Sequence, residues 1–386
     1  MTRYLLAGAA AAALALGAGA ANAQAKFEVK VGGDAYFEAG YVDQDLDSGL
    51  RSTEFRNRMR INIIPSAKAD NGLEYGARLR FRANSGASNA RTTDADRAYI
   101  FAQGTFGQVR MGVTNSFNDE TYVTAPLDYL PLGIYDALPT WIGGNNGITS
   151  GAASVVTNGN TIITQSLVAE GNATKIVYFS PRFAGLQVGA SYTPRNDSSH
   201  NDVNRVKPVG TLAGTANGIY QDMVEVGANY NNTFGGVTLK ASAGYFWGRA
   251  VDDVAGSNYK DLNSWQAGAS VGYAGFSLGG GYVDYGKSGQ NKRPGVFTEN
   301  TRNWVVGAQY TTGPIVVGAN YKNGKDAGSL LAAGDRELQV YELGVGYTVA
   351  PGLTLQAQYD YFKINNDTAV ADDKGNVVLV RSILAF

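Results

Sequence analysis

Apolar and polar residues alternate along most of the chain. In FEVKVGGDAYFEAGYV, residues 27–42, most odd positions carry Phe, Val, Ala or Tyr, whereas the even positions include Glu28, Lys30 and Glu38. Residues 73–82, LEYGARLRFR, alternate in the same way. A period of two is the pattern of a β-strand with one apolar and one polar face. The alternation therefore predicts an all-β protein.

Sixteen segments carry this strand pattern. We expect strands at residues 27–42, 53–64, 73–83, 97–104, 107–114, 173–180, 185–193, 222–231, 236–247, 262–273, 276–284, 302–311, 314–321, 338–348, 353–362 and 377–386. Short connections rich in turn residues alternate with long polar ones. This rhythm predicts a 16-stranded antiparallel transmembrane barrel with short periplasmic turns at one end and long external loops at the other.

The segment EFRNRMRINII, residues 54–64, places arginine at every second position of one predicted strand. An arginine facing lipid at mid-membrane costs about 2–4 kcal/mol, so these side chains cannot face hydrocarbon. In a soluble sandwich they would face water, but no second layer is evident to cover the apolar faces. A barrel in lipid turns them into a wet lumen. The predicted pore constriction wall, called the arginine wall below, is Arg56, Arg58, Arg60, Arg78, Arg80, Arg82 and Arg110.

The longest connection, residues 115–172, far exceeds the roughly 12–15 residues usual for an unstructured loop. Its first half contains no Lys or Arg and is rich in Tyr, Leu, Pro and Trp. Its acidic residues are Asp119, Glu120, Asp128 and Asp136. We expect this constriction loop to fold into the lumen, with its acids facing the arginine wall. A lid on the surface is the alternative.

The first 23 residues have the character of a targeting segment. Arg3 precedes the apolar run LLAGAAAAALALGAGA, and Ala21-Asn22-Ala23 fits the small-x-small cleavage rule. This pattern predicts a secretory signal peptide at 1–23 and a barrel at 24–386. A membrane anchor is the weaker alternative, because the run is short and alanine-rich. After residue 23 no apolar run approaches the roughly 18 residues of a transmembrane helix.

Composition narrows the chemistry. The chain has 32 basic and 33 acidic residues, a balance that disfavours a nucleic-acid binder. Cysteine is absent, which excludes disulfides and thiolate metal sites. His200 is the single histidine, so zinc sites with several histidine ligands are excluded. We expect no enzymatic activity and no cofactor.

One acidic segment is an exception to that expectation. DQDLDSGLRSTE resembles a calcium-binding EF-hand loop, but Ser48 stands where the motif requires glycine. An ordinary acidic loop is the preferred interpretation, and a weak external Ca²⁺ site is the alternative. Its candidate ligands are Asp43, Asp45, Asp47 and Glu54.

Several stretches together resemble the Gram-negative general-diffusion porins of alphaproteobacterial type. They are the signal peptide, the hairpins DRAYIFAQGTFGQVRMGV and NATKIVYFSPRFAGLQVGASY, and a final strand ending in Phe386. Ser382 interrupts the apolar series of that strand. The resemblance implies a homotrimer in the outer membrane, in contact with its lipid and lipopolysaccharide. It also implies a third external loop that folds inward, with acids opposite arginines.

The function expected from these observations is passive diffusion of small hydrophilic solutes and ions through a water-filled channel. The alternative with the same architecture is a substrate-selective channel, for example for anions or sugars. An outer-membrane enzyme or adhesin is disfavoured by the shortage of histidine.

Overall fold

The structure is a computed structural model of the whole chain. It describes residues 26–85, 91–129, 141–142, 171–203, 205, 220–251, 258–292, 299–327, 333–367 and 371–386. In these ranges no helix has the length and apolarity needed to cross a membrane. The predicted signal peptide and Asp136 lie outside the described residues.

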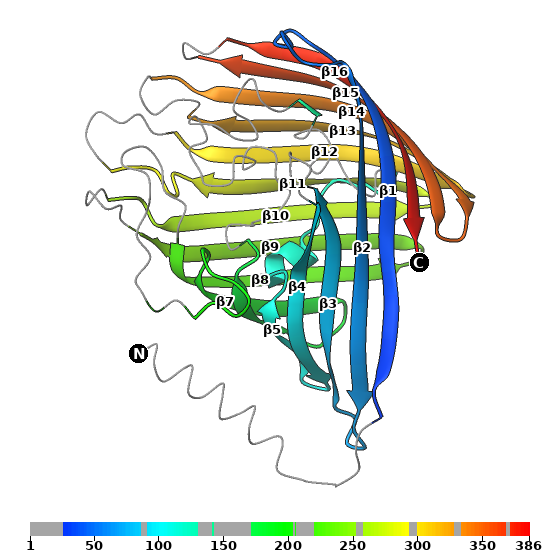
Figure 1. Cartoon of the computed structure of the whole chain (residues 1–386), viewed down its shortest axis with the longest axis vertical. Helices are drawn as coiled ribbons and strands as arrows, with labels where there is room; N and C mark the ends of the chain where they lie inside the picture. The colour runs from blue at the N-terminus through cyan, green and yellow to red at the C-terminus, as the bar shows by residue number, and fades with distance from the viewer. Residues whose placement is uncertain are drawn as a thin grey trace.

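Sixteen antiparallel strands form one closed barrel, as predicted (Figure 1). The strands are β1 (Glu28–Gln44), β2 (Thr53–Lys68), β3 (Glu74–Ser85), β4 (Arg91–Gly104), β5 (Gly107–Val113), β6 (Thr174–Phe179), β7 (Leu186–Arg195), β8 (Tyr220–Phe234), β9 (Val237–Ala250), β10 (Leu262–Tyr273), β11 (Phe276–Gly286), β12 (Thr301–Thr312), β13 (Ile315–Asp326), β14 (Arg336–Ala350), β15 (Leu353–Asn366) and β16 (Asp373–Ala385). Each strand pairs with its neighbours in sequence, and β1 pairs with β16 to close the barrel.

The closure between the first and last strands is reinforced at the C-terminus. The backbone N–H of Gly33 donates to the carbonyl of Phe386 at 2.7 Å, and the N–H of Phe386 donates back to Gly33 at 3.0 Å. The described turns at this end are tight. Only Ala274 and Gly275 join β10 to β11. Both residues have positive φ, as the two central residues of a type I′ hairpin turn require.

Several strands extend beyond their predicted ends. β2 continues to Lys68 through Pro65, and β13 continues to Asp326. The predicted ends lay at residues 64 and 321. Pairing persists beyond that point because backbone hydrogen bonds do not require an apolar side chain.

Large apolar side chains cover the outside of the barrel. Phe55, Val31, Ile100, Leu343 and Val380 are each more than half exposed. An exposed apolar surface that follows every strand is far larger than a soluble monomer carries. It is the surface expected in contact with hydrocarbon.

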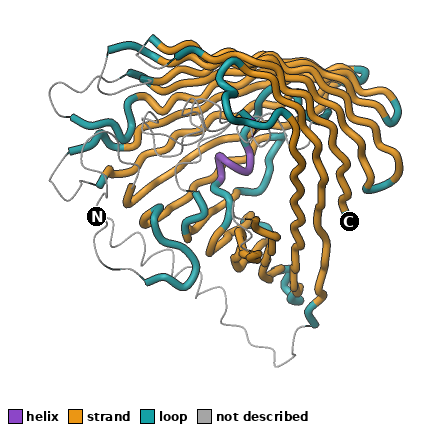
Figure 2. Tube along the Cα trace, turned by 45° about the horizontal axis from the view of Figure 1, so that its top comes forward, coloured by secondary structure: helices purple, strands orange, loops and turns teal. Residues whose placement is uncertain are grey.

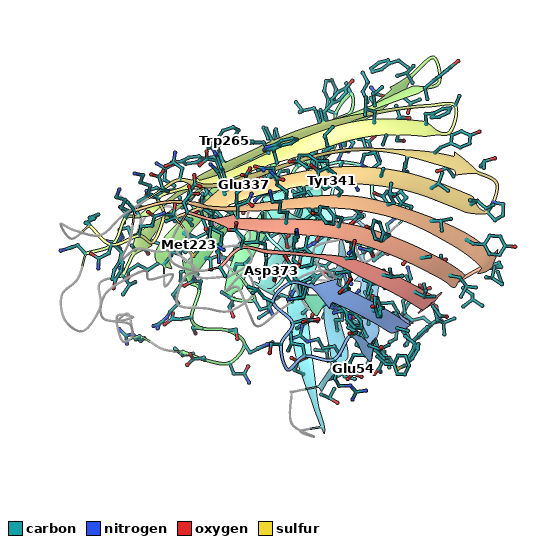
Figure 3. All side chains as sticks on the ribbon, turned by 90° about the horizontal axis from the view of Figure 1, so that it is seen from above. Glu54, Met223, Trp265, Glu337, Tyr341 and Asp373 are labelled. Atoms are coloured by element: carbon teal, nitrogen blue, oxygen red, sulfur yellow. The ribbon has the colours of Figure 1, made fainter. Side chains whose placement is uncertain are left out.

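Aromatic side chains form a belt across β10–β14 on this outer surface, and Figure 3 labels two of them, Trp265 and Tyr341. Trp265 stacks on Tyr282 with ring centroids 4.9 Å apart. The belt continues through Trp304, Tyr321 and Tyr341, whose successive centroids are 5.2 and 4.8 Å apart. Such girdles mark the membrane–water interface.

Candidate channel constriction

The constriction loop turns into the barrel directly after β5 (Figure 2). Ser116 caps the short helix α2 (Phe117–Thr121), accepting a hydrogen bond from the N–H of Asp119 at 3.3 Å. The N–H of Phe117 donates to Oγ of Ser191 on β7 at 3.0 Å. The N–H of Asn118 donates to Oε1 of Glu225 on β8 at 2.7 Å. The helix is therefore fastened to the inner face of the barrel.

Beyond α2 the loop follows the same inner face from strand to strand. The N–H of Val123 donates to Oγ of Ser242 on β9 at 2.7 Å. The N–H of Asp128 donates to Oε1 of Gln309 on β12 at 3.0 Å. The hydroxyl of Tyr129, which is fully buried, donates to Oε1 of Glu342 on β14 at 3.0 Å. The prediction that this loop folds inward is confirmed for its described part.

A row of glycines makes room for the loop. On the inner faces of β7 to β11 and of β13, glycine stands where the loop passes, and we call these residues the glycine stripe. They are Gly189, Gly227, Gly244, Gly268, Gly281 and Gly318. A Cβ at Gly189 would overlap the ring of Phe117, and one at Gly268 would overlap the carbonyl of Val123. The stripe thus lets the loop lie directly on the sheet.

The arginine wall lies on other strands of the barrel, and carboxylates of the neighbouring strands pair with it. On β2, Nε of Arg60 lies 2.8 Å from Oδ1 of Asp34, and a terminal nitrogen of Arg58 lies 3.4 Å from Oδ2 of the same residue. Arg56 approaches Glu38 at 2.5 Å. The register between β1 and β2 sets residues 34 and 38 opposite arginines 60 and 56.

The arginines of β3 are held in the same way. Arg80 forms two hydrogen bonds to Asp96, at 2.7 and 2.6 Å. Arg82 forms two to Asp94, at 2.7 and 2.8 Å. Arg78 donates to the amide oxygen of Asn62 at 2.9 and 2.8 Å. Paired contacts of this kind fix guanidinium groups in a defined plane and offset the repulsion among them.

Tyr36, Glu38 and Arg381 join the arginine wall to the loop. The guanidinium of Arg58 lies 5.0 Å from the ring centroid of Tyr36. Glu38 is buried and accepts a hydrogen bond from Nε of Arg381 at 2.6 Å. It also accepts one from Nε1 of Trp141, a loop residue, at 2.7 Å. The sequence did not identify Tyr36, Glu38 or Arg381 as site residues. The alternation in residues 27–42 nevertheless placed Tyr36 and Glu38 on the polar face of the first strand.

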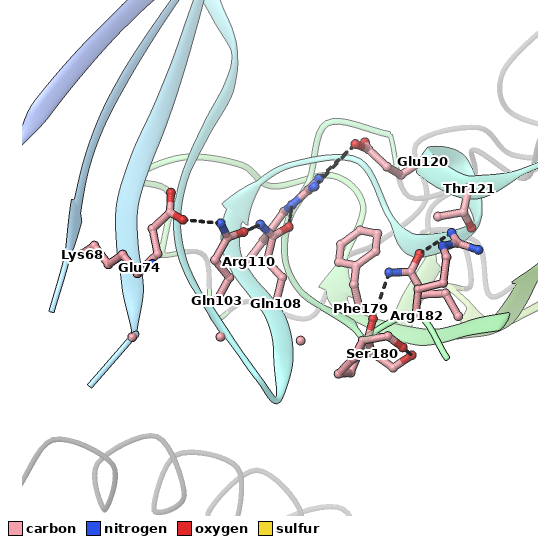
Figure 4. Close-up of a pocket in the computed structure, with 15 residues that line it drawn as sticks. Lys68, Glu74, Gln103, Gln108, Arg110, Glu120, Thr121, Phe179, Ser180 and Arg182 are labelled. Atoms are coloured by element: carbon pink, nitrogen blue, oxygen red, sulfur yellow. Dashed lines mark hydrogen bonds and ion pairs between the residues drawn. The ribbon is translucent and has the colours of Figure 1, made fainter. Parts of the chain in front are cut away.

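Arg110 is one wall arginine that meets an acid in the described part of the loop. Its guanidinium lies over the ring of Phe179, 4.5 Å from the centroid, and 3.4 Å from Oε1 of Glu120 (Figure 4). Its Nε donates to Gln108 at 2.7 Å. These residues line a cavity of about 530 Å³. Within the described part of the loop, Asp128 instead pairs with Gln309, accepting its amide hydrogen at 2.6 Å.

The calcium candidates are not brought together. Asp43 lies on β1 beyond Tyr41, with its side chain on the outer face, whereas Glu54 pairs with Gly40 and so faces inward. Nowhere among the described residues do three or more acids or histidines gather as a metal site would require.

Comparisons with known proteins agree with the fold. A sequence profile of the Gram-negative porin family matches residues 9–368. An uncharacterised protein of Rickettsia conorii is 23% identical over 392 residues, which cover 87% of this chain and 86% of that protein. An anion-selective porin from Comamonas acidovorans has a TM-score of 0.61 and 18% identity, covering 94% of this chain and all of that one.

Two other solved structures agree. A triple mutant of Rhodopseudomonas blastica porin has a TM-score of 0.55 at 18% identity, covering 93% of this chain and 100% of that one. An outer-membrane protein of Vibrio cholerae, OmpT, described in its trimer form, has a TM-score of 0.58 at 14% identity, covering 93% and 99%. At these identities the structures show the fold alone, whereas the profile spans most of the chain. The chain belongs to the Gram-negative porin family.

Proposed function

We propose that the passage of this outer-membrane diffusion channel is narrowed between the constriction loop and the arginine wall, and that solutes are filtered there by size and charge. Membership of the porin family makes the chain a passive channel for small hydrophilic solutes. The observation that carries the proposal is the division of the barrel interior. Hydrogen bonds fasten the described part of the loop mainly to strands between β7 and β15, with one further bond from Trp141 to β1, whereas the arginines stand on β2, β3 and β5.

The charge balance favours a modest preference for anions. Six of the seven wall arginines meet the strand carboxylates of Asp34, Glu38, Asp94 and Asp96 and the loop carboxylate of Glu120, whereas Arg78 donates to the amide of Asn62. Basic groups therefore exceed the acidic groups that they contact. The Comamonas relative in structure is described as anion-selective, which supports the same direction.

Reversal potentials across planar bilayers in a KCl gradient test the proposal. Replacing Arg58→Ala and Arg80→Ala together should shift the permeability ratio toward cations. Arg249→Ala is the matched control, because Arg249 pairs with Asp222 on the outer surface of the barrel. An unchanged ratio in the double variant would remove these arginines from the solute path.

A substrate-selective channel is the second candidate, and one observation favours it. Arg56, Arg58 and Arg60 succeed one another on one face of β2, spaced at about 6.6 Å along the strand. An anion would bind to one guanidinium group after the next as it moves along the wall. Saturable block of KCl current by added phosphate would identify this channel, whereas a general-diffusion channel conducts phosphate without block.

We also propose that three copies assemble through the apolar outer face of β1–β3, where Phe37 and Phe55 pack with centroids 5.4 Å apart. The trimer form described for the Vibrio cholerae protein supports this. Triplet conductance steps are the expected record, and isolated single steps would contradict it.

A further inference from the structure

The constriction loop leaves β5 and returns to β6, and these two strands are neighbours in the barrel (Figure 1). Val113, the last residue of β5, pairs with Thr174, the first residue of β6. The two ends of the loop therefore lie side by side, at the end of the sheet that carries the long connections. A side chain that contacts both ends fixes the direction in which the loop enters the barrel.

One buried ammonium group contacts both ends of the loop. Lys175 lies on the inner face of β6 and is only 2% exposed. Its Nζ donates to the carbonyl of Thr114, directly before the loop, at 2.8 Å. It also donates to the carbonyl of Gly171, near the end of the loop, at 3.0 Å. Because a buried ammonium group without acceptors is costly, Lys175 and the two carbonyls hold one another in place.

One guanidinium group contacts the same two ends from β4, on the other side of β5. Nε of Arg97 donates to the side-chain oxygen of Asn115 at 2.6 Å, and Nη1 donates to that of Asn172 at 2.7 Å. These asparagines are the first and last residues of the constriction loop. Nη1 also donates to the carbonyl of Asp96 at 2.6 Å, which fixes the plane of the guanidinium group. We call Arg97 and Lys175 together the root clamp.

A β-bulge directs Arg97 into the barrel. Arg80 of β3 pairs with Arg97, and the following residue of β3 pairs with Ala95. Asp96 is thus an extra residue of β4, and regular alternation from Asp96 would turn Arg97 to the outer, apolar face. The bulge instead allows Asp96 to bind Arg80 of the arginine wall while Arg97 reaches the loop.

The root clamp lies directly before the part of the loop that enters the lumen. Asn115 precedes Ser116, which caps α2. Phe117 of this helix packs on Val177 and Phe179, the next inward residues after Lys175 on β6. A change of direction at the root would therefore move α2 and the segment behind it away from the glycine stripe.

We propose that Arg97 and Lys175 are positioning residues of the channel: the root clamp sets the angle at which the constriction loop enters the lumen and keeps the loop on the glycine stripe. The inference rests on the proposed function only in that this loop narrows the passage. Neither residue has to contact solute. The contacts of Arg97 use a planar fork of donors, so a lysine at this position keeps the charge but loses the clamp.

The position of the loop can be measured with a single thiol, because the chain contains no cysteine. Ala125 lies in the loop beyond α2 and is 3% exposed, so Ala125→Cys should react slowly with a negatively charged thiosulfonate reagent. In this background Arg97→Lys and Lys175→Met should each raise the modification rate about 10-fold or more, because hydrogen bonds to a charged group are lost. The rate is followed as the mass increase of the purified full chain in detergent micelles.

The matched control is Arg249→Lys in the same background. It alters a guanidinium group that pairs with Asp222 on the outer surface of the barrel, and it should leave the modification rate unchanged. Asn115→Ala should act like Arg97→Lys, and the two changes together should raise the rate no further than either alone, because they remove the same contact.

Two results would overturn the proposal. Unchanged modification rates in Arg97→Lys would mean that the charge of Arg97, or the other contacts of the loop, suffices to hold it. Fully additive effects of Arg97→Lys and Asn115→Ala would mean that the two residues do not act through each other. Arg97→Lys keeps its charge, so it decides the question even where Lys175→Met fails to assemble. Reversal potentials of the Arg58 and Arg80 variants test the charge filter separately, so failure of that proposal would leave the thiol result intact.

Discussion

The arginine wall and the glycine stripe differ in the side chains that they place on the inner surface of the barrel: long and charged in the wall, absent in the stripe. On β2 and β3 long charged side chains reach into the lumen and are steadied by carboxylates on adjacent strands. On β7–β11 and β13 the inward side chain is reduced to a hydrogen atom at the positions that the loop covers. The same strand geometry thus carries either inward arginines, which we propose meet solute, or the seat of the loop that we propose narrows the path.

The difference shows how a regular barrel obtains an asymmetric interior. A loop that rested on large side chains would stand farther into the lumen, and it would need those side chains to pack under it. Glycine removes that layer, and Ser191, Ser242 and Gln309 hold the loop backbone through hydrogen bonds. The position of the proposed constriction would therefore depend on the glycine stripe as much as on the arginine wall.

The largest expected effect comes from refilling the glycine stripe. Gly268→Val places a branched side chain where the carbonyl of Val123 lies, so the loop must leave the sheet. Overpacking of this kind costs about 1–3 kcal/mol, and a displaced loop alters single-channel conductance. Ala267→Val is the control, because residue 267 faces outward on the same strand. Unchanged conductance and unfolding temperature in Gly268→Val would break the comparison between the two walls.

A smaller effect is expected where the loop meets β14. Tyr129→Phe removes the hydroxyl that donates to Glu342 at 3.0 Å and accepts from Asn320 at 2.5 Å. Losing a buried hydrogen bond to a carboxylate costs about 1–3 kcal/mol. We expect a lower thermal unfolding temperature in detergent and noisier open-channel current. Tyr178→Phe, which loses an exposed hydrogen bond at the turn end, should change neither.

Most of the fold could be predicted from the sequence because alternation is a local property. Each strand shows its two faces within about ten residues, and the alternation of short and long connections orders the strands. The ends of β2 and β13 were wrong, because pairing beyond the apolar band has no hydrophobic signal. The same alternation also predicted that the arginines of β2 and β3 face the inside of the barrel.

The partners within the site could not be predicted, because they depend on register and on the path of the loop. Asp34 meets Arg60 only because β1 and β2 pair in one particular register. The glycine stripe is scattered over six strands, and a single sequence does not distinguish a glycine under a loop from one in a turn. Of the loop acids, Glu120 meets a wall arginine because α2 follows β5 directly.

The smallest expected effect comes from removing one carboxylate charge beside the arginine wall and, in a second variant, one from the loop that lies on the glycine stripe. Asp34→Asn frees the guanidinium groups of Arg58 and Arg60, whereas Asp128→Asn removes a loop carboxylate that contacts Gln309. A unit charge about 6 Å from a permeating ion in water is worth about threefold in permeability ratio. Reversal potentials at low salt should shift toward anions by roughly that factor in Asp34→Asn, and by less in Asp128→Asn. The difference should shrink at 1 M salt, where screening is short-ranged. Equal shifts in the two variants would mean that the net charge of the lumen alone sets ion selectivity. In that case the position of each charge, on the arginine wall or on the loop, would not affect a passing ion.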